Sequence, residues 1–302
     1  MGRPRRHGGD AVRSLAAQGN ATNGVDRWLA SRGGRARVEQ RRFSGYVGGR
    51  RDHTAPDTGL LVDTLIDCRD AARTYGRGEN AVVAVHGATF QVRTGDRIAI
   101  MGPSGSGKST LLHLMAGLER PTSGKIGWPA LGRPATAHDI GVVFQSPSLI
   151  PALDVVEKAA LPLVLSGTAE PEARRRALSA LDAVGVADLA DKLPEELSGG
   201  QAQRVAVARV LALRPKVVLA DEPTGQLDRA TGRHVMDVLL DTAAELGAAL
   251  VVTTHDPTVG ERLTERWPMH EGRLATTAPA PAASTPRAAP RARPNAAQGE
   301  TS

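Results

Sequence analysis

Residues Arg97 to Thr110 read RIAIMGPSGSGKST. The first five residues form a largely apolar run that predicts a buried β-strand ending at Met101, and a helical pattern follows directly from Ser109. The loop between them has the order Gly, four residues, Gly, Lys, Ser. A strand, a glycine-rich loop of this spacing and a helix are together typical of a phosphate-binding loop.

The loop carries the groups that a nucleoside triphosphate requires. Its glycines let the backbone turn tightly, so that consecutive N–H groups and the positive end of the following helix form an anion cradle. We expect Lys108 at the β- and γ-phosphates and the Ser109 hydroxyl on Mg²⁺. The alternative is a glycine-rich loop without a ligand. The expected ATP-binding residues of the loop are Gly102, Pro103, Ser104, Gly105, Ser106, Gly107, Lys108, Ser109 and Thr110.

Two acidic residues end a second strand pattern. Four apolar residues, 217–220, lead into Asp221 and Glu222. A carboxylate at a strand end can hold Mg²⁺, and a neighbouring carboxylate can orient or deprotonate a water molecule. Taken alone, such a pair is more often a helix N-cap. The phosphate-binding loop upstream favours the catalytic interpretation, with Asp221 at the metal and Glu222 as general base.

A third motif, LSGGQ, occupies residues 197–201 and opens a helical pattern. Its serine and glycines predict a second anion site at a helix N-terminus, and the alternative is an N-cap without a ligand. The motif ends twenty residues before Asp221, and together with the phosphate-binding loop it resembles the signature of the ATP-binding-cassette (ABC) ATPases. The resemblance implies a pair of cassettes in which the signature of one completes the nucleotide site of the other. The residues expected to act in trans are Ser198, Gly199, Gly200 and Gln201.

The resemblance also assigns roles to four residues that the spacing alone does not single out. Gln145, after the strand pattern GVVF, matches the glutamine that touches Mg²⁺ and the attacking water, and His255 matches the histidine at the γ-phosphate. Asp228, in GQLD, matches the aspartate at the dimer interface, and Tyr75 matches the aromatic residue that stacks on adenine. Without the resemblance, Tyr75 and His255 would each be interpreted as structural residues at strand ends. The expected catalytic residues are Glu222, His255 and Gln145, and the expected metal ligands are Ser109, Gln145 and Asp221.

Strand patterns alternate with longer helical patterns over about residues 60–275, which predicts an α/β domain with a mainly parallel sheet. The expected strands are 62–68, 82–85, 98–100, 142–144, 217–220 and 249–253, and the expected helices are 109–117, 155–165, 171–184, 200–213 and 230–245. The helical patterns between 154 and 184 are not followed by a strand pattern until residue 217. We therefore predict a helical subdomain at about 146–200. The resemblance adds a small antiparallel β lobe, so the fold expected over 58–275 is a P-loop NTPase of the ABC type. The Gly/Arg-rich residues 1–57 and the Ala/Pro-rich residues 276–302 are interpreted as disordered tails.

The charge of the 302-residue chain is unevenly distributed. Twelve Arg and four acidic residues give residues 1–52 a charge of +8 and residues 276–302 carry +2, so the total of +6 leaves −4 for the part between them. The basic character belongs to the tails and does not by itself indicate that the folded part binds nucleic acid. The single cysteine, Cys68, excludes an intramolecular disulfide and favours a reducing compartment. No stretch approaches the roughly 18 apolar residues of a spanning helix, so we expect peripheral attachment at most.

The resemblance implies an ATPase subunit that uses ATP and Mg²⁺ to power a separate transmembrane permease from the cytoplasmic face of the membrane. Residues 78–92 and 144–167 look like the lipoprotein-release and macrolide-export type of subunit, whereas Gln226 departs from the Asn or Ala that is more usual there.

The alternative is a soluble ABC ATPase that acts on nucleic acid or the ribosome, with the Arg-rich tails as electrostatic arms. We expect no specific nucleic-acid binding, because the tails contain few aromatic residues interleaved with the charges. A third alternative, a nucleotide-binding regulator without turnover, predicts the loss of Glu222 or His255, and both are present.

Overall fold

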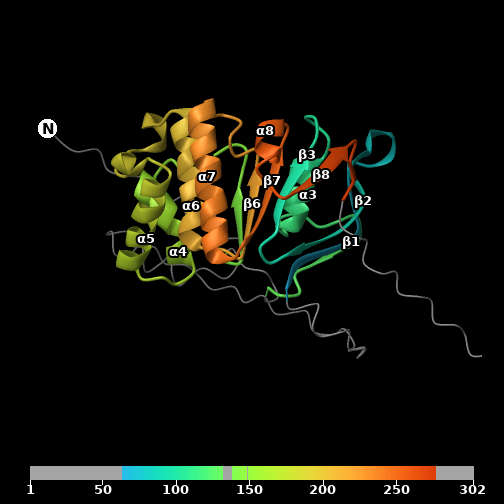
Figure 1. The fold of residues 1–302 in the computed structure, drawn as a ribbon, viewed down its shortest axis with the longest axis horizontal. Helices are drawn as coiled ribbons and strands as arrows, with labels where there is room; N and C mark the ends of the chain where they lie inside the picture. Colours follow the sequence, from blue (N-terminus) through green and yellow to red (C-terminus); the bar gives the residue numbers. More distant parts are fainter. Residues whose placement is uncertain (1–62, 132–137, 148, 277–302) are drawn as a thin grey trace, which may run out of the picture.

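The computed structural model describes residues 63–131, 138–147 and 149–276, which contain both strands and helices (Figure 1). The strands are β1 (Thr64–Tyr75), β2 (Val82–Arg93), β3 (Arg97–Met101), β4 (Ser123–Gly127), β5 (Ile140–Val143), β6 (Val217–Asp221), β7 (Ala249–Thr254), β8 (Glu265–His270) and β9 (Arg273–Leu274). The α-helices are α3 (Lys108–Met115), α4 (Val155–Leu165), α5 (Glu170–Ala183), α6 (Gly199–Leu213), α7 (Arg229–Leu246) and α8 (Pro257–Gly260). Short 3-10 helices lie at Gly78–Asn80, Ala187–Leu189 and Pro194–Glu196. The tails predicted at 1–57 and 276–302 lie outside the described residues, apart from residue 276.

The described residues form two sheets. The larger has the strand order β5-β6-β7-β3-β8-β9, in which all neighbours from β5 to β8 are parallel and β9 runs antiparallel to β8. The smaller has the order β2-β1-β4 and is antiparallel. This arrangement confirms the predicted mainly parallel core with a small antiparallel lobe.

Alternating side chains of the parallel strands enter two apolar cores. In β6, Val217 and Leu219 pack with α3 and the antiparallel lobe, whereas Val218 and Ala220 pack with α4 to α7 on the other face. A central parallel strand is buried on both faces, and for this reason β6 reads as an uninterrupted apolar run. The sheet thereby presents the ends of β3, β6 and β7 at one edge, where the predicted site residues follow each strand.

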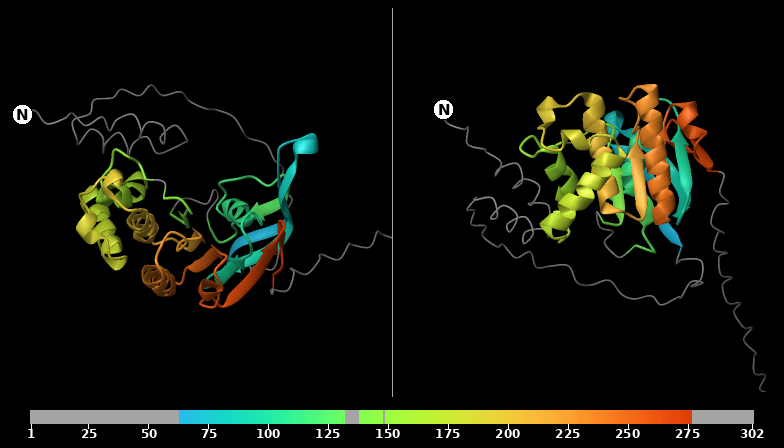
Figure 2. Two further views of the ribbon diagram at one scale, coloured as in Figure 1. Left: turned by 90° about the horizontal axis from the view of Figure 1, so that it is seen from above. Right: turned by 60° about the vertical axis from the view of Figure 1, so that its left-hand side comes forward.

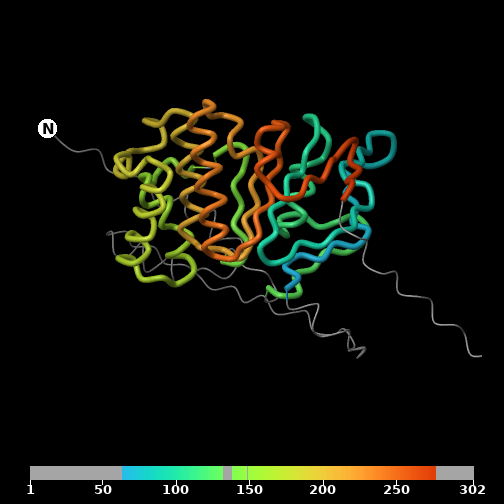
Figure 3. The backbone as a smooth tube through the Cα atoms, in the orientation of Figure 1, coloured from blue at the N-terminus to red at the C-terminus, as the bar shows by residue number. Residues whose placement is uncertain are grey.

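The helical part of the chain lies at the end of the molecule opposite β1 and β2 (Figure 2). The backbone leaves β5, passes through α4 and α5, and returns along α6 to β6 (Figure 3). Helix α4 packs against α5 and α6 and begins with a capping box, in which Asp154 and Glu157 bond each other's backbone N–H groups. The subdomain boundaries at about 146–200 stay a prediction.

Several elements differ from those expected. Strands β1 and β2 continue to Tyr75 and Arg93, beyond the expected ends at 68 and 85, and β4, β8 and β9 were not expected at all. Strand β5 ends at Val143, so that Gln145 lies in the loop that follows. No helix in the described part of the chain combines the length and apolar character that crossing a membrane requires.

Candidate active site

The loop from Gly102 to Gly107 connects β3 to α3 and is held closely by two other strands. Gly105 and Gly107 have φ values of 77° and 97°, a region in which side chains other than glycine are strained. A Cβ on Gly107 would lie 2.1 Å from the Ala84 carbonyl oxygen of β2, and one on Gly102 would lie 2.0 Å from the Met269 carbonyl oxygen of β8. Glycine is therefore required at Gly102 by close packing and at Gly105 by backbone conformation, whereas Gly107 is subject to both constraints.

The polar side chains of this loop suit an anion. Lys108 is the first residue of α3, is only 5% exposed, and donates from Nζ to the carbonyl oxygens of Gly102 and Pro103 at 2.9 Å each. Ser106 Oγ is buried and has no hydrogen-bond partner in the described residues. Ser109 and Thr110 follow in the first turn of α3. A buried hydroxyl without a partner beside a buried cation fits the oxygen atoms of a phosphate chain.

Three of the predicted groups meet at the carboxylate of Glu222. Its Oε1 lies 3.3 Å from His255 Nδ1 and 3.8 Å from Lys108 Nζ. Its Oε2 accepts a hydrogen bond of 3.4 Å from Gln145 Nε2. The Glu222 side chain is only 15% exposed, whereas that of His255 is 63% exposed. The fold thus brings three residues, from the start of α3 and from the segments after β5 and β7, to one carboxylate at the edge of the parallel sheet.

The two acidic residues are fixed by Thr253, which sequence reasoning did not predict as part of the site. Thr253 lies opposite Asp221 in the β6–β7 register and is fully buried. Its hydroxyl donates to Asp221 Oδ1 at 2.5 Å and accepts from the Glu222 backbone N–H at 3.1 Å. The signal that could have revealed it is a threonine pair within the otherwise apolar strand ALVVTT.

The backbone at Glu222 adopts a conformation that is unusual for a residue with a side chain. Its φ is 44°, in the left-handed region, and its N–H also donates to the Thr253 carbonyl oxygen at 3.1 Å. Strained backbone of this kind persists where the surroundings hold it, often at functional sites. The alternative that the acidic pair is a helix N-cap is wrong, because Asp228 caps the next helix, α7.

The signature motif opens α6 and faces outward. Ser198 is the N-cap: its Oγ accepts from the Gln201 N–H at 3.3 Å, and its own N–H donates to Gln201 Oε1 at 2.9 Å. Ser198 and Gly199 are exposed. Within the described part of the chain, residues 198–201 form no hydrogen bond or ion pair with the phosphate-binding loop. Their predicted role in a second chain's site is consistent with this exposure but stays a prediction.

Two glutamine side chains attach the loop around Gln145 to neighbouring elements. Gln226, in the loop before α7, donates from Nε2 to the Gln145 carbonyl oxygen at 3.4 Å. Gln203, which is fully buried in α6, donates to the carbonyl oxygen of Phe144 at 3.3 Å. Gln226 Oε1 also lies close to Gly199, since a Cβ there would be 3.4 Å away. The loop of Gln145 is therefore linked to the loop before α7 and to the signature helix.

Asp228 is occupied within its own chain. Its Oδ1 accepts from the N–H groups of Ala230 and Thr231 at 3.0 Å each, which caps α7. The hydrogen bonds from Thr231 lower the pKa of the Asp228 carboxyl, because they stabilise its ionised form. The side chain is exposed at the start of the helix, and its predicted position at a dimer interface stays a prediction.

Tyr75 ends β1 beside an exposed apolar residue of β2. Tyr75 and Val82 are paired across the two strands and are 37% and 64% exposed. Two residues further along β2, the Ala84 carbonyl oxygen touches the phosphate-binding loop at Gly107. An exposed aromatic and aliphatic pair so close to a phosphate site is suited to the flat face of a base.

The donor set also fits a magnesium ion held jointly with phosphate. The described residues contain no cluster of three or more His, Cys, Asp or Glu side chains that would form an all-protein metal cage. Mg²⁺ commonly binds through one or two carboxylates together with substrate phosphates. Asp221, Ser109 and Gln145 are the residues that would supply the protein ligands.

Comparisons with known proteins identify the family to which the chain is similar. Residues 85–225 match the family model described as ABC transporter. The chain is 40% identical over 223 residues to the lipoprotein-releasing system ATP-binding protein LolD of Legionella pneumophila (strain Paris), a match that covers 71% of this chain and 98% of LolD.

Solved structures give the same result. The dimeric, post-hydrolysis ATP-binding cassette MJ0796 bound to ADP and Pi has a TM-score of 0.65 and 35% identity, over 70% of this chain and 96% of the cassette. The cbiO1 protein of Clostridium perfringens, part of the ABC transporter complex cbiONQ, has a TM-score of 0.61 and 31% identity, over 70% of this chain and 87% of its own.

Proposed function

The chain belongs to the ABC transporter family of ATP-binding proteins, and from this we propose how its own residues bind and hydrolyse ATP. It is the ATP-binding subunit of a transporter whose membrane-spanning component is a separate chain, and it works as one of a pair of cassettes. The soluble alternative that acts on nucleic acid is not favoured, since the similarity to LolD and cbiO1 lies with transport systems.

One observation carries the mechanism: the Glu222 carboxylate is the meeting point of Lys108, Gln145 and His255. The Lys108 ammonium group donates to two loop carbonyl oxygens and lies near Glu222. A triphosphate bound in the loop would be a stronger anionic partner for this ammonium group than the carbonyl oxygens are. Glu222 is then available to accept a proton from the attacking water, with Gln145 and His255 orienting the water and the γ-phosphate. The water oxygen bonds to the γ-phosphorus as the bond to the β-phosphate oxygen breaks, which yields ADP and phosphate.

Mg²⁺ supplies charge neutralisation of the phosphate oxygens when it is bound. Asp221 is placed for this by Thr253, Gln145 lies in the loop after the neighbouring strand β5, and Ser109 lies in the first turn of α3. The base stacks on Tyr75 against the exposed Val82.

The outward position of the signature motif supports a site shared between two chains. Ser198 and Gly199 are exposed, and in the described part of the chain the start of α6 forms no hydrogen bond with the phosphate-binding loop. When the dimer closes on ATP, this helix N-terminus contacts the γ-phosphate of the ATP that is bound to the partner chain.

We place the protein at the cytoplasmic face of the membrane, bound to its permease. The similarity to LolD supports a permease of the lipoprotein-releasing or related export type. The transported cargo is determined mainly by the permease, so no residue described above selects it.

The mechanism is tested with Glu222→Gln, which keeps the shape of the side chain and removes its basicity. We expect turnover to fall by about 10²- to 10⁴-fold and ATP to stabilise a dimer that gel filtration resolves. Glu261→Gln, an exposed carboxylate outside the site, is the matched control and keeps both turnover and the monomer profile. Full turnover by Glu222→Gln contradicts the assignment of the general base.

The partner is tested by pulling the tagged Glu222→Gln protein from detergent-solubilised membranes with ATP present, followed by mass spectrometry. We expect a polytopic membrane protein to be recovered. Recovery of ribosomes or nucleic acid without a permease contradicts the transport role.

A further inference from the structure

Tyr75 is held from two directions by residues that belong to no motif. The Arg73 guanidinium carbon lies 4.7 Å from the centroid of the Tyr75 ring. The Tyr75 hydroxyl donates to Glu119 Oε2 at 2.6 Å, and Arg73 Nε donates to the same oxygen at 2.9 Å. Arg73 is anchored further by a bond of 3.1 Å from its NH1 to the Arg120 carbonyl oxygen. The three side chains form a closed triangle.

We propose that Arg73 and Glu119 are positioning residues that hold Tyr75 as a pre-formed platform for the purine base of the nucleotide. This inference rests on the proposed function, in which Tyr75 stacks on that base. Arg73 and Glu119 act through Tyr75 and touch no reacting atom.

The geometry fixes both the plane and the direction of the ring. Arg73 and Tyr75 are two residues apart on β1, and the 4.7 Å from the guanidinium carbon to the ring centroid shows that their side chains lie together. The guanidinium covers one face of the ring and Glu119 holds its hydroxyl, and since Tyr75 is 37% exposed we place the base on the opposite face. A ring fixed in advance loses less conformational freedom when a ligand stacks on it, and this raises affinity without a new contact.

The charge of Arg73 also matters. An aromatic ring carries negative charge on its faces, which repels the electron-rich face of another ring. A cation above one face draws electron density towards itself and reduces that repulsion on the other face. The platform therefore favours a purine stacked opposite Arg73.

The triangle connects the base site to the phosphate site. Glu119 lies four residues after the end of α3, the helix whose first residue is Lys108. His113, within α3, has its Nδ1 3.8 Å from Glu119 Oε1. The platform and the phosphate cradle are thus attached to one helix, so the distance between base and phosphates is set before ATP arrives.

The test measures ATP turnover by purified protein. Arg73→Ala is expected to raise KM for ATP by about two- to fivefold with little change in kcat, and Arg73→Lys is expected to restore most of the affinity. Inhibition by inorganic tripolyphosphate, which has no base, should be the same in both variants and the wild type, which also shows that the phosphate site is intact.

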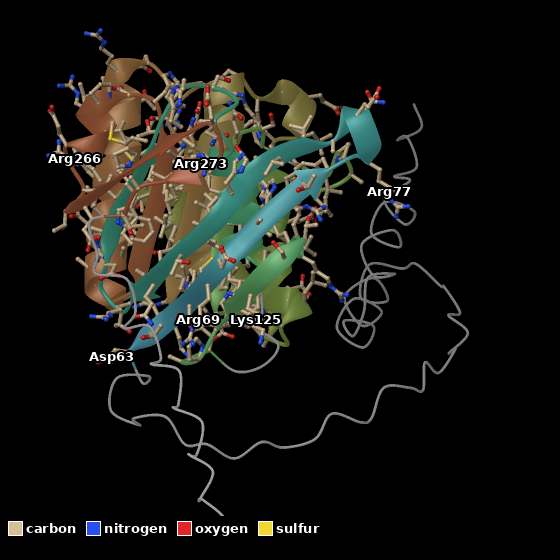
Figure 4. All side chains as sticks on the ribbon, turned by 90° about the vertical axis from the view of Figure 1, so that its right-hand side faces the viewer. Asp63, Arg69, Arg77, Lys125, Arg266 and Arg273 are labelled. Carbon is tan, nitrogen blue, oxygen red and sulfur yellow. The ribbon has the colours of Figure 1, made fainter. Side chains whose placement is uncertain are left out.

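The matched control is Arg69→Ala. Arg69 is an exposed arginine on the same strand, paired with Asp67 at 2.8 Å, and it lies near the Asp63 end of the sheet with Lys125, far from Arg77 at the hairpin end (Figure 4). Its KM should equal that of the wild type.

A double-mutant cycle with Tyr75→Ala decides whether Arg73 acts through the ring. We expect Tyr75→Ala to raise KM for ATP and Arg73→Ala to have no further effect in that background. An equal effect of Arg73→Ala in both backgrounds, or none in either, overturns the inference and leaves the proposed function standing. If Tyr75→Ala itself leaves KM unchanged, the proposed base site is wrong, and the inference is wrong with it.

Discussion

Replacing Thr253 with valine removes one hydroxyl from the centre of the site and keeps the shape of the side chain. In the protein this hydroxyl donates to Asp221 Oδ1 at 2.5 Å and accepts from the Glu222 N–H at 3.1 Å, and Thr253 is fully buried. In the variant the Glu222 N–H keeps its bond to the Thr253 carbonyl oxygen, whereas the Asp221 carboxylate, 4% exposed, loses its hydroxyl donor.

The cost follows from the charge of the acceptor. A hydrogen bond to a charged group contributes about 1.5–3 kcal/mol, and a buried acceptor left without its partner costs a similar amount. We therefore expect Thr253→Val to lower the free energy of unfolding by about 2 kcal/mol, which for a domain of this size lowers Tm by about 4–8 °C. Because Asp221 would hold Mg²⁺, the Mg²⁺ concentration needed for half-maximal turnover should also rise.

Two assays check this expectation. Thermal unfolding measures the loss of stability. ATP turnover as a function of Mg²⁺ concentration measures how well Asp221 is still positioned for the metal. The matched control is Thr254→Val, because the Thr254 side chain is also buried and, among the residues that the structure describes, its hydroxyl accepts only from the Asp256 N–H at 3.0 Å. Its Tm should fall less and its Mg²⁺ dependence should not change. If Thr253→Val has the Tm and Mg²⁺ dependence of the wild type, the hydroxyl does not support Asp221 and the reasoning is refuted.

Three further substitutions test other contacts. Gln226→Ala removes the bond to the Gln145 carbonyl oxygen and should lower turnover by about two- to fivefold in a steady-state assay, and an unchanged rate would contradict this link. Burial lowers the pKa of Lys158 from 10.5 to about 8. Between pH 8 and 10.5 the unfolded chain therefore binds more protons than the folded protein, and the free energy of unfolding should rise with pH. Urea titrations at pH 8 and 10 should show this rise in the wild type and a smaller one in Lys158→Met. Gly107→Ala places a Cβ 2.1 Å from the Ala84 carbonyl oxygen at a φ of 97° and should cost at least about 2 kcal/mol in denaturant unfolding, whereas wild-type stability would show that the loop can move aside.

The central strands could be predicted from the sequence because burial on both faces leaves a continuous apolar run. Strands β6 and β7 are buried at every position, and their predicted ends differ from the observed ones by a single residue. The phosphate-binding loop could be predicted equally well, because its residues are adjacent in the chain and lie directly between a strand and a helix.

Strands without such a pattern were missed for physical reasons. Strand β4 reads SGKIG and is exposed over its first three residues, so it has no apolar alternation and a single strand-favouring residue, Ile126. Strand β8 reads ERWPMH, and Pro268 within it argues against a strand. It forms because Trp267 is fully buried against Phe90, with ring centroids 5.3 Å apart, a contact between residues far apart in the sequence.

The residues of the candidate site form the same two groups: those that could be predicted from the sequence and those that only the fold reveals. Most of the predicted residues are ones expected to contact the nucleotide, and the residue types of a short motif are enough to predict such a ligand. Thr253, Arg73 and Glu119 have other residues as partners, and those contacts exist only once two strands are in register or a strand lies beside a helix end. Gln226 shows how far motifs alone can go. Comparison with the family motif shows that a glutamine is unusual at this position, but only the fold shows that its amide donates to the Gln145 carbonyl oxygen. Motifs therefore predict what this site does, and the contacts between its loops determine how firmly each group is held while it does so.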